Sequence, residues 1–541
     1  MKHCRLQTYV LALCFMAFGH ITHGKKKITT PENPTWEEVT KNYEFPTWFT
    51  EARFGIWLHW GAQTQPSKGG GWYARHMYQE DVGREKWGKN AYAYHNKTYG
   101  HPSEVGFKDV ANAWKAENLD ANKLTKYFKS IGAKYLMVLS SHHDHFDNFA
   151  STYHPWNSVN VGPHRDIIGE FNKAAKRYHI PYCVSSHDDR YKRWWLPAFG
   201  SDKSGPKKGV HYDGYMTKED GIGKWWEGLD PADLYGVPPE KRTPAWHKKV
   251  DQNWLDRHTE LVTKYDVDML WFDGHEFPYD SYGKELCRRF YYNSMKKSGK
   301  VNVVVAGKFR NEPATVKDVE RGGTNEILRV PWQGTLTFGS WFYKEDKEIR
   351  HNTRTVIENM ADIISKNGNL LLNVELYPDG TIPPSHKLIL DEVGQWIHTN
   401  KEAIYASKPW SVYGDNLGST RMVSKDGGQI GEVNLADLKK NKKKEHFNAR
   451  TKSSPAYGND EVRFTTKGDH LYMFVLNPAE GDIEIPSLGF ASLKDKEAIR
   501  SIKMLGGHKV QFKQKQDKLV LSVPNKRPNN YCAVFRIDGL L

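Results

Sequence analysis

Cysteine is scarce in this chain. Only five cysteines occur in 541 residues, and three of them, Cys183, Cys287 and Cys532, lie beyond the first 24 residues. Three thiols in a chain of this size cannot provide the disulfide framework that stabilises small secreted domains. We therefore predict that all three are buried as small apolar side chains.

Long hydrophobic runs are also lacking. Hydrophobic residues make up 38% of the chain, and the mean hydropathy is −0.73. A body that spans a membrane needs stretches of about 20 apolar residues, and this composition excludes one. At 541 residues the chain is long enough to bury more than one core, so we expect two domains.

The first 24 residues differ from the rest. Lys2 and Arg5 form a short basic head, and residues 9–18 are largely apolar but too few to cross a bilayer. This pattern predicts a secretory signal peptide over residues 1–24, and hence an exported protein, periplasmic or secreted. Lipoprotein processing at Cys14 is the alternative, but Leu13 is bulky where that process needs a small residue.

Acidic residues are outnumbered. The chain has 78 Lys and Arg against 64 Asp and Glu, a formal net charge of +14. No recognisable nucleic-acid-binding motif accompanies this charge, so we expect no nucleic-acid partner. Two interpretations remain: a soluble basic enzyme with a solvated face, or attraction to a polyanion such as a sulfated or uronate-bearing glycan. The nineteen Trp favour a sugar ligand, because sugar rings stack on indole, although a large core also uses Trp.

A repeat of helix and buried strand organises residues 35–400. A buried strand that ends in a polar group and a glycine is expected at 54–61. Further strands are expected at 135–139, 182–184, 269–272, 301–305 and 370–374, and helical apolar spacing precedes each of these five. This alternation predicts a parallel sheet covered by helices. The fold class is α/β, with a (β/α)8-like barrel over residues 35–400 as the prediction and an open doubly wound sheet as the alternative.

The C-terminal part has another character. Segments 471–476, 483–485, 519–523 and 533–537 alternate apolar and polar residues between turn signals, which predicts an antiparallel β-sandwich over residues 405–541. The basic run 439–444 is expected to be a solvated loop. Within the barrel, residues 190–250 are too long for an ordinary loop, and are either a wall of a binding cleft or simple packing.

Asp273 is the residue on which the functional prediction depends. It directly follows the apolar run 269–272, and Gly274 then lets the chain turn away. In a parallel barrel the carboxyl ends of the strands form the catalytic face. We therefore predict that Asp273 is a catalytic nucleophile.

Histidines follow three other strands. His59 comes after the first, His142 and His143 after the second, and His187 after the third. Because strand ends converge on the barrel axis, these imidazoles are expected to share one site. Neutral imidazoles that bond sugar hydroxyls are the favoured interpretation. Metal binding and isolated structural histidines are the alternatives, and neighbouring histidines on an extended segment point to opposite sides, which disfavours one shared ion.

A glycosidase needs a second carboxyl group across the scissile bond. Glu276, Glu312 and Glu320 are the candidates. Glu276 is only three residues from Asp273, and is more suitable as a ligand of sugar hydroxyls. Glu312 and Glu320 lie on the connection after segment 301–305, and the residue pattern barely separates them.

Two tryptophans complete the expected site. Trp332 and Trp341 follow that connection, and each is either an apolar wall for the sugar or part of the core.

At these residues the chain resembles glycoside hydrolase family 29, the retaining α-L-fucosidases. Four segments carry the resemblance in order along the barrel: 53–61 (RFGIWLHWG), 141–144 (SHHD), 270–274 (LWFDG) and 365–374 (SKNGNLLLNV), the last continuing to 378–383 (PDGTIP). The resemblance implies a catalytic barrel followed by a β-sandwich.

The resemblance also implies roles. By position, His59, Trp60, His142 and His143 look like sugar-binding residues, Asp273 like the nucleophile, and Glu320 like the acid/base. A family arginine that contacts the sugar falls near Lys308 or Arg310.

Two departures stand out. His145 replaces the glycine that usually follows His-His-Asp, and Ser186 or His187 occupies a position that is often Tyr. Both changes are where ring substituents would be recognised, so an α-L-galactosidase or a sulfated-fucoside-specific glycosidase is an alternative.

The predicted function is therefore an exo-acting retaining α-L-fucosidase that acts on a glycan with a terminal α-L-fucose or related L-sugar, without metal or organic cofactor. A polyanionic glycan is one of the two interpretations of the basic charge. Two rivals from other classes are a non-catalytic glycan-binding protein and a metal-dependent hydrolase that uses the histidines. The sequence does not indicate an oligomeric state.

Overall fold

The computed structural model describes residues 33–80, 90–310, 312–324, 326–417, 457–493 and 498–541, together with the backbone of two strands at 420–424 and 430–434. The predicted signal peptide (1–24) and the basic run 439–444 lie outside the described residues. No helix among the described residues is long and apolar enough to cross a membrane.

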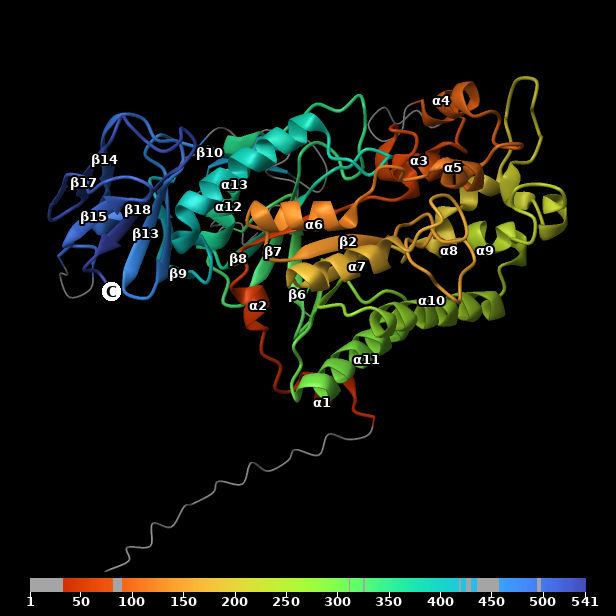
Figure 1. Cartoon of the computed structure of the whole chain (residues 1–541), viewed down its shortest axis with the longest axis horizontal. Coiled ribbons are helices and arrows are strands. Elements are labelled where there is room, and N and C mark those ends of the chain that lie inside the picture. The colour runs from red at the N-terminus through yellow and green to blue at the C-terminus, as the bar shows by residue number, and fades with distance from the viewer. Residues whose placement is uncertain are drawn as a thin grey trace, which may run out of the picture.

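The first part of the chain is a closed barrel of eight parallel strands, in the order β1 to β8 (Figure 1). The barrel prediction is confirmed, and the alternative of an open doubly wound sheet is wrong, because β8 pairs with β1, Phe54 opposite Leu370. The strands are β1 Phe54–Leu58, β2 Leu136–Ser141, β3 Tyr182–Ser186, β4 Met269–Phe272, β5 Val304–Gly307, β6 Val316–Glu320, β7 Trp332–Thr337 and β8 Gly368–Asn373.

Helices cover the outside of the barrel. Several begin at a capping residue that can be recognised in the sequence. The side chain of Asp120, for example, accepts a hydrogen bond from the backbone N–H of Lys123 at the start of α6. The helices are α1 Trp36–Thr40, α2 Thr47–Thr50, α3 Tyr73–His76, α4 Ala91–Thr98, α5 Phe107–Ala113, α6 Ala121–Ser130, α7 Ile167–Tyr178, α8 Tyr191–Trp194, α9 Pro231–Tyr235, α10 Pro244–Lys264, α11 Ser281–Ser298, α12 Thr353–Ser365 and α13 Pro384–Ile404.

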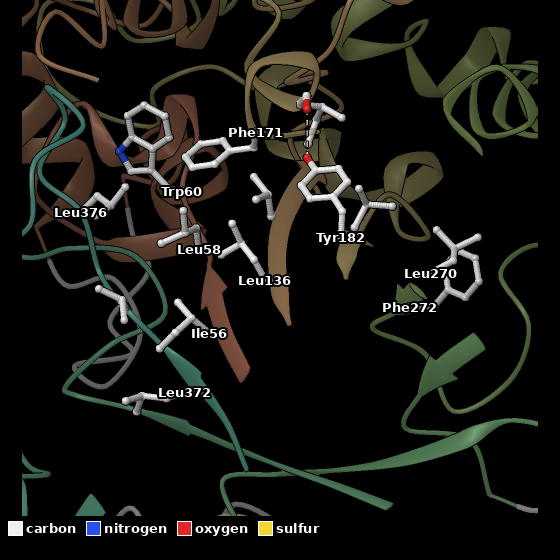
Figure 2. Packing of buried hydrophobic residues seen from close by; sticks show 14 of the residues in the cluster. Ile56, Leu58, Trp60, Leu136, Phe171, Tyr182, Leu270, Phe272, Leu372 and Leu376 are labelled. Carbon is white, nitrogen blue, oxygen red and sulfur yellow. Dashed lines mark hydrogen bonds between the residues drawn. The ribbon is translucent and has the colours of Figure 1, made fainter. Parts of the chain in front are cut away.

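Each barrel strand presents alternate residues to two different environments. Figure 2 shows Ile56, Leu58 and Trp60 of the first strand and the segment after it, with Phe171 of α7, in the apolar layer between the strands and the helices. The residues between them, such as Trp57, face a second core that fills the barrel. This alternation decides which polar side chains reach the catalytic face.

β6 and β7 were not expected as strands, and the placing of Glu320 on a connection is corrected: it is the last residue of β6. Both strands carry polar residues into the barrel. Asp318 accepts hydrogen bonds from Gln333 (2.7 Å) and from the indole of Trp271 (2.9 Å), and Gln333 accepts one from Tyr135 (2.9 Å). A polar interior leaves no apolar run in the sequence, so the usual strand signal is missing.

The C-terminal part contains antiparallel sheets, as predicted. A five-stranded sheet in the order β15-β18-β13-β12-β9 and a three-stranded sheet in the order β14-β17-β16 enclose one hydrophobic core, and β10 pairs with β11. The strands are β9 Lys408–Asp415, β10 Thr420–Ser424, β11 Ile430–Asn434, β12 Val462–Lys467, β13 His470–Val475, β14 Gly481–Ile485, β15 Ser501–Met504, β16 Phe512–Gln514, β17 Leu519–Val523 and β18 Ala533–Asp538.

The sandwich is fastened to the barrel through α12 and α13 (Figure 1). Arg463 of β12 binds Asp362 of α12 at 2.7 Å, and the indole of Trp396 on α13 donates to the carbonyl of Cys532 at 2.9 Å. All of these groups are buried. The sandwich therefore packs on the barrel's helices, on the side opposite to the long insertion.

The three cysteines are buried and free, as predicted: Cys183, Cys287 and Cys532. The insertion 190–250 contains α8, α9 and short 3₁₀ helices, and it packs beside α3, α4 and α5 at the other end of the barrel (Figure 1). Only part of it faces the site described next.

Candidate active site

Three adjacent strands of the barrel bring together two carboxylates and one ammonium group. Asp273 follows β4, Lys308 follows β5, and Glu320 ends β6. The Lys308 Nζ atom is 2.6 Å from Asp273 Oδ1 and 2.5 Å from Glu320 Oε2. Because one nitrogen touches both, the two carboxylate oxygens lie no more than about 5 Å apart, the separation of the carboxyl pair in a retaining glycosidase.

The charges of this group stabilise one another. Burial alone would raise the pKa of Asp273, but Lys308, His187 and His143 hold it well below its ordinary value. Burial alone would lower the pKa of Lys308, but the two carboxylates raise it instead. Asp273 is therefore a carboxylate and Lys308 an ammonium over the whole neutral range of pH.

Four imidazoles surround Asp273. The ring centroids of His59 and His187 are 4.6 Å apart, and those of His142 and His143 are 4.3 Å apart. His143 Nε2 lies 3.6 Å and His187 Nδ1 lies 3.7 Å from Asp273 Oδ2. The structure thus brings together the histidines that the sequence places after β1, β2 and β3.

Burial keeps these rings neutral. It is the first cause that lowers the pKa of all four, and neighbouring imidazoles add to the effect for His59 and His142. The pKa of His143 falls to about 3, although Asp273 opposes the fall. A neutral imidazole has one donor and one acceptor nitrogen, which suits a hydroxyl group.

Some of the ring nitrogens of these histidines already have hydrogen-bond partners within the protein. His142 Nδ1 accepts from the Gln63 amide at 2.8 Å, and His143 Nδ1 donates to the carbonyl of His187 at 2.5 Å. Among the described residues, His59 Nδ1 and His187 Nε2 are buried without a hydrogen-bond partner. A buried polar atom without a partner is costly, so these two atoms are suited to a ligand.

Aromatic side chains form the walls. The Trp341 indole donates to Glu320 Oε1 at 3.2 Å, and its ring lies 5.3 Å from that of His59. Phe342 packs edge-on against His59 at 4.9 Å. On the other side, Trp194 of the insertion lies 4.8 Å from His143, so part of the insertion lines the site.

Three predicted residues lie elsewhere. The indole of Trp60 donates to the carbonyl of Tyr377 within the outer apolar layer (Figure 2). Trp332 begins β7 opposite Lys317, at the other end of the barrel from the carboxyl pair, and its indole donates to the carbonyl of Lys366. Glu276 is exposed. The structure brings none of these three to the histidines.

The choice between the two downstream glutamates is clear in the structure. Glu312 Oε1 accepts a hydrogen bond from the indole of Trp36 on α1 at 3.0 Å, whereas Glu320 shares Lys308 with Asp273. Glu320 is therefore the carboxyl group that faces Asp273.

A buried ion network supports the loops that carry the histidines. Arg257 of α10 binds Asp147, which follows β2, and Asp188, which follows β3, and all three side chains are fully buried. His145 joins the network through Asp188 at 2.8 Å, and the Ser186 hydroxyl contacts His258 at 2.7 Å. Of the residues at which the sequence departs from the family pattern, His145 and Ser186 thus lie in the support of the site, whereas His187 lies beside Asp273.

The histidines also have the spacing of metal ligands. Ligand atoms of His59, His142 and His187, and likewise of His143, His187 and Asp273, lie within 4.8 Å of one another. The charge around Asp273 does not suit a metal, because Lys308 is at 2.6 Å and Arg190 at 3.5 Å. Two cations on this carboxylate oppose a divalent ion.

Sequence reasoning missed several residues of the site. The resemblance points to Lys308 or Arg310 as the place of a basic residue at the sugar, but the role of Lys308 as a bridge needs the positions of β4 and β6. Gln63 comes from a connection, where the sequence has no periodic signal that points to an orientation. Arg190 and Trp194 lie in the insertion 190–250, for which the sequence suggests a wall of the cleft without singling out these two residues.

Comparisons with known proteins agree with this geometry. The model of the alpha-L-fucosidase family matches residues 20–402. The tissue alpha-L-fucosidase of Rattus norvegicus is 28% identical over 391 residues, which cover 70% of this chain and 73% of that protein. An alpha-L-fucosidase of Branchiostoma floridae is 26% identical over 399 residues, 71% of this chain and 77% of that protein.

Solved structures show the same fold. The alpha-fucosidase of Thermotoga maritima in complex with a mechanism-based inhibitor superposes with a TM-score of 0.66 at 22% identity, over 94% of this chain and 100% of that chain. The alpha-L-fucosidase isoenzyme 1 of Paenibacillus thiaminolyticus has a TM-score of 0.61 at 20% identity, over 91% and 98% of the two chains.

The buried network predicts the effect of Arg257→Met. Without the guanidinium, Asp147 and Asp188 remain buried without their cation, so the free energy of unfolding should fall by about 3–5 kcal/mol. Burial already raises the pKa of Asp147 to about 7 and that of Asp188 to about 6 against the opposing effect of Arg257. In the variant both pKa values rise further above their unfolded values, so the loss of stability grows with pH from about 5 to about 8.

Denaturant unfolding of Arg257→Met at the two pH values measures this effect. The control is Arg289→Met, because Arg289 pairs with Glu285 at the surface, where removal should cost less than about 1 kcal/mol. Equal small losses in the two variants, or a loss independent of pH, would contradict the role of Arg257.

Proposed function

This chain is a glycoside hydrolase of the alpha-L-fucosidase family, and we propose that it releases terminal L-fucose from a glycan by a retaining, two-step displacement. The observation that carries the proposal is the pair of carboxyl groups, Asp273 and Glu320, bridged by the Lys308 ammonium at 2.6 and 2.5 Å. In a retaining enzyme the pair is about 5–5.5 Å apart, whereas an inverting enzyme needs a wider gap of about 6.5–9.5 Å for a water molecule.

In the first step Asp273 is the nucleophile. One carboxylate oxygen attacks the anomeric carbon, and the bond from that carbon to the glycosidic oxygen breaks. Glu320, which must first take up a proton although it lies beside Lys308, gives that proton to the departing oxygen, so the aglycone leaves as a neutral alcohol. The low pKa of Asp273 favours this role, because the nucleophile is ionised before the substrate arrives.

In the second step the glycosyl ester is hydrolysed. Glu320, now a carboxylate, takes a proton from a water molecule that attacks the anomeric carbon from the face the aglycone has left. The carbon–oxygen bond to Asp273 breaks, and fucose departs with its original anomeric configuration. Glu320 passes on one proton in the first step and regains it from water in the second, so the mechanism needs no cofactor or metal.

The neutral imidazoles recognise the sugar. His59 Nδ1 and His187 Nε2 are buried without partners among the described residues, and they supply fixed hydrogen-bonding groups for the ring hydroxyls. Trp341 gives the sugar an apolar wall and bonds Glu320. A non-catalytic glycan-binding protein would have no need for the buried, charge-matched carboxyl pair.

Export is the second part of the proposal. The basic head and apolar stretch within residues 1–24 have the pattern of a secretory signal. The enzyme would then meet its glycan in the periplasm or outside the cell.

Asp273→Ala should abolish turnover of an aryl α-L-fucoside, with kcat reduced by at least about a thousandfold, since the carboxylate that forms the ester is then missing. Sodium azide should restore part of the activity and give a fucosyl azide of inverted configuration, because the small anion replaces the carboxylate. Asp280→Asn, an exposed aspartate, is the control. Turnover of Asp273→Ala close to that of the unaltered enzyme would contradict the role.

Lys308→Met tests the bridge. Lys308 is the largest of the groups that lower the pKa of Asp273 against the effect of burial, so its removal should raise that pKa. The acidic limb of the kcat/KM profile should then move to higher pH, since Asp273 must be ionised to attack.

Lys308→Arg is the matched variant, because it keeps the positive charge beside Asp273. Its acidic limb should stay near that of the unaltered enzyme. If the Met and Arg variants have the same profile, the charge of Lys308 does not control Asp273.

A further inference from the structure

Basic side chains gather at the rim of β6 and β7, next to the carboxyl pair. Arg321 directly follows Glu320, and its backbone N–H donates to the carbonyl of Thr335 at 3.0 Å. The backbone N–H groups of Arg350 and His351 both donate to the carbonyl of Phe338, just after β7, at 2.8 and 3.3 Å. With Lys347, which precedes Arg350 and His351 on the same connection, these residues form what we call the cationic cluster: the cations Arg321, Lys347 and Arg350 together with His351, whose ring is neutral at neutral pH because its pKa is about 4.

The cluster contains buried polar atoms that lack partners. His351 is only 4% exposed, and among the described residues neither of its ring nitrogens has a hydrogen-bond partner. The Nε atom of Arg321 is likewise buried without one. Native structures rarely leave several such atoms together, and their presence indicates a site that a polar ligand completes.

The side chains of the cluster lie close enough to repel one another. Burial, then Arg321 and Arg350, lower the pKa of His351 to about 4. Burial, then Arg350, Lys344 and Arg321, lower the pKa of Lys347. Burial is the larger cause of both shifts, and the neighbouring positive charges add to it, so an anion at this place would relieve the repulsion between them.

The nearby carboxylates Glu320 and Glu375 favour the charge of Arg321, but the nearby acidic groups also have other partners. Glu375 Oε1 accepts the backbone N–H groups of Gly339 and Ser340 at 2.9 and 2.6 Å. Asp346 pairs with Lys68 at 3.0 Å and with Lys344 at 3.7 Å. The cluster is therefore suited to an anion that comes from outside the chain.

The cluster touches the catalytic group through one side chain. The Arg321 guanidinium lies over the ring of Trp341, 4.9 Å from its centroid, and the Trp341 indole donates to Glu320 at 3.2 Å. Glu320 gives its proton to the leaving oxygen in the proposed function, so the leaving sugar must lie on this side of the site.

We infer that the cationic cluster binds an oxyanion, a sulfate ester or a carboxylate, on the sugar that carries the fucose. The inference rests on the proposed function and extends it, since it assigns the substrate to the anionic glycans. Guanidinium groups bind both kinds of oxyanion through paired hydrogen bonds. Packing on Trp341 alone would explain the position of the Arg321 guanidinium. It would not explain why both ring nitrogens of His351 are buried without a hydrogen-bond partner among the described residues.

The test compares three α-L-fucosides that differ only in the aglycone: neutral, sulfated and carboxylated. The kcat/KM of each is measured at low salt for the unaltered full chain and for Arg321→Gln and Arg350→Gln. Lys513→Gln is the control, because it removes the same charge from an exposed position in the sandwich. The ratio of anionic to neutral kcat/KM is the readout, so a general loss of activity in a variant cancels.

We expect the unaltered enzyme to prefer one of the anionic fucosides by about tenfold or more. The preferred one identifies the source of the oxyanion. Arg321→Gln and Arg350→Gln should each lose most of this preference, and Lys513→Gln should keep it. No preference in the unaltered enzyme, or a preference that both arginine variants keep, would overturn the inference.

Failure of the proposed function would look different. If the unaltered enzyme cleaves none of the three fucosides, the proposed function fails. Equilibrium binding of the same three compounds, measured by calorimetry, then tests the cluster alone. Tighter binding of an anionic fucoside that Arg321→Gln abolishes would support the cluster, and equal binding of all three would overturn it.

Discussion

The Lys308 ammonium holds two carboxylates that would otherwise repel each other. Asp273 and Glu320 lie within hydrogen-bond distance of this one nitrogen, in a place that is largely buried. Two acidic groups at this separation would compete for a proton if no cation lay between them. The bridge exists because β4, β5 and β6 are neighbours in the barrel, so the closed sheet is what sets the distance between the two groups.

The rest of the catalytic face is held in place from behind. Arg257 ties the segments after β2 and β3 to α10 through Asp147 and Asp188. His143 and His187 stand on those same segments, and they contact each other through a ring nitrogen and a carbonyl. A site fixed in this way need not reorganise when a sugar arrives, which is the condition under which polar groups contribute most to catalysis.

The sequence predicts the architecture well where strands are apolar. The runs at 54–58 and 269–272 are buried throughout, and the sandwich strands alternate as their sequences indicate. β6 and β7 were not predicted, because they carry polar residues that face the inside of the barrel. Asp318 and Gln333 bond to each other there, and such residues interrupt the apolar run by which a buried strand is recognised.

The candidate site could be predicted only in part. Asp273 and the four histidines follow apolar strands. Because the ends of those strands converge on the barrel axis, the sequence was enough to predict that these side chains share one site. Trp60 shows the limit: it directly follows His59, yet successive side chains point to opposite sides, and the indole packs in the outer layer. A residue that follows a strand lies at the rim of the barrel. Whether its side chain faces the barrel axis depends on its place in the alternation of side chains along the segment.

The central claim is that Asp273 forms a covalent bond to the sugar, and trapping that bond tests it most directly. A 2-deoxy-2-fluoro-fucosyl donor slows both steps, and a good leaving group lets the ester accumulate. Mass spectrometry of the digested protein should then find one added fluorofucosyl group, on the peptide that contains Asp273. A label on another residue, or steady turnover of the donor without any labelled peptide, would contradict the account.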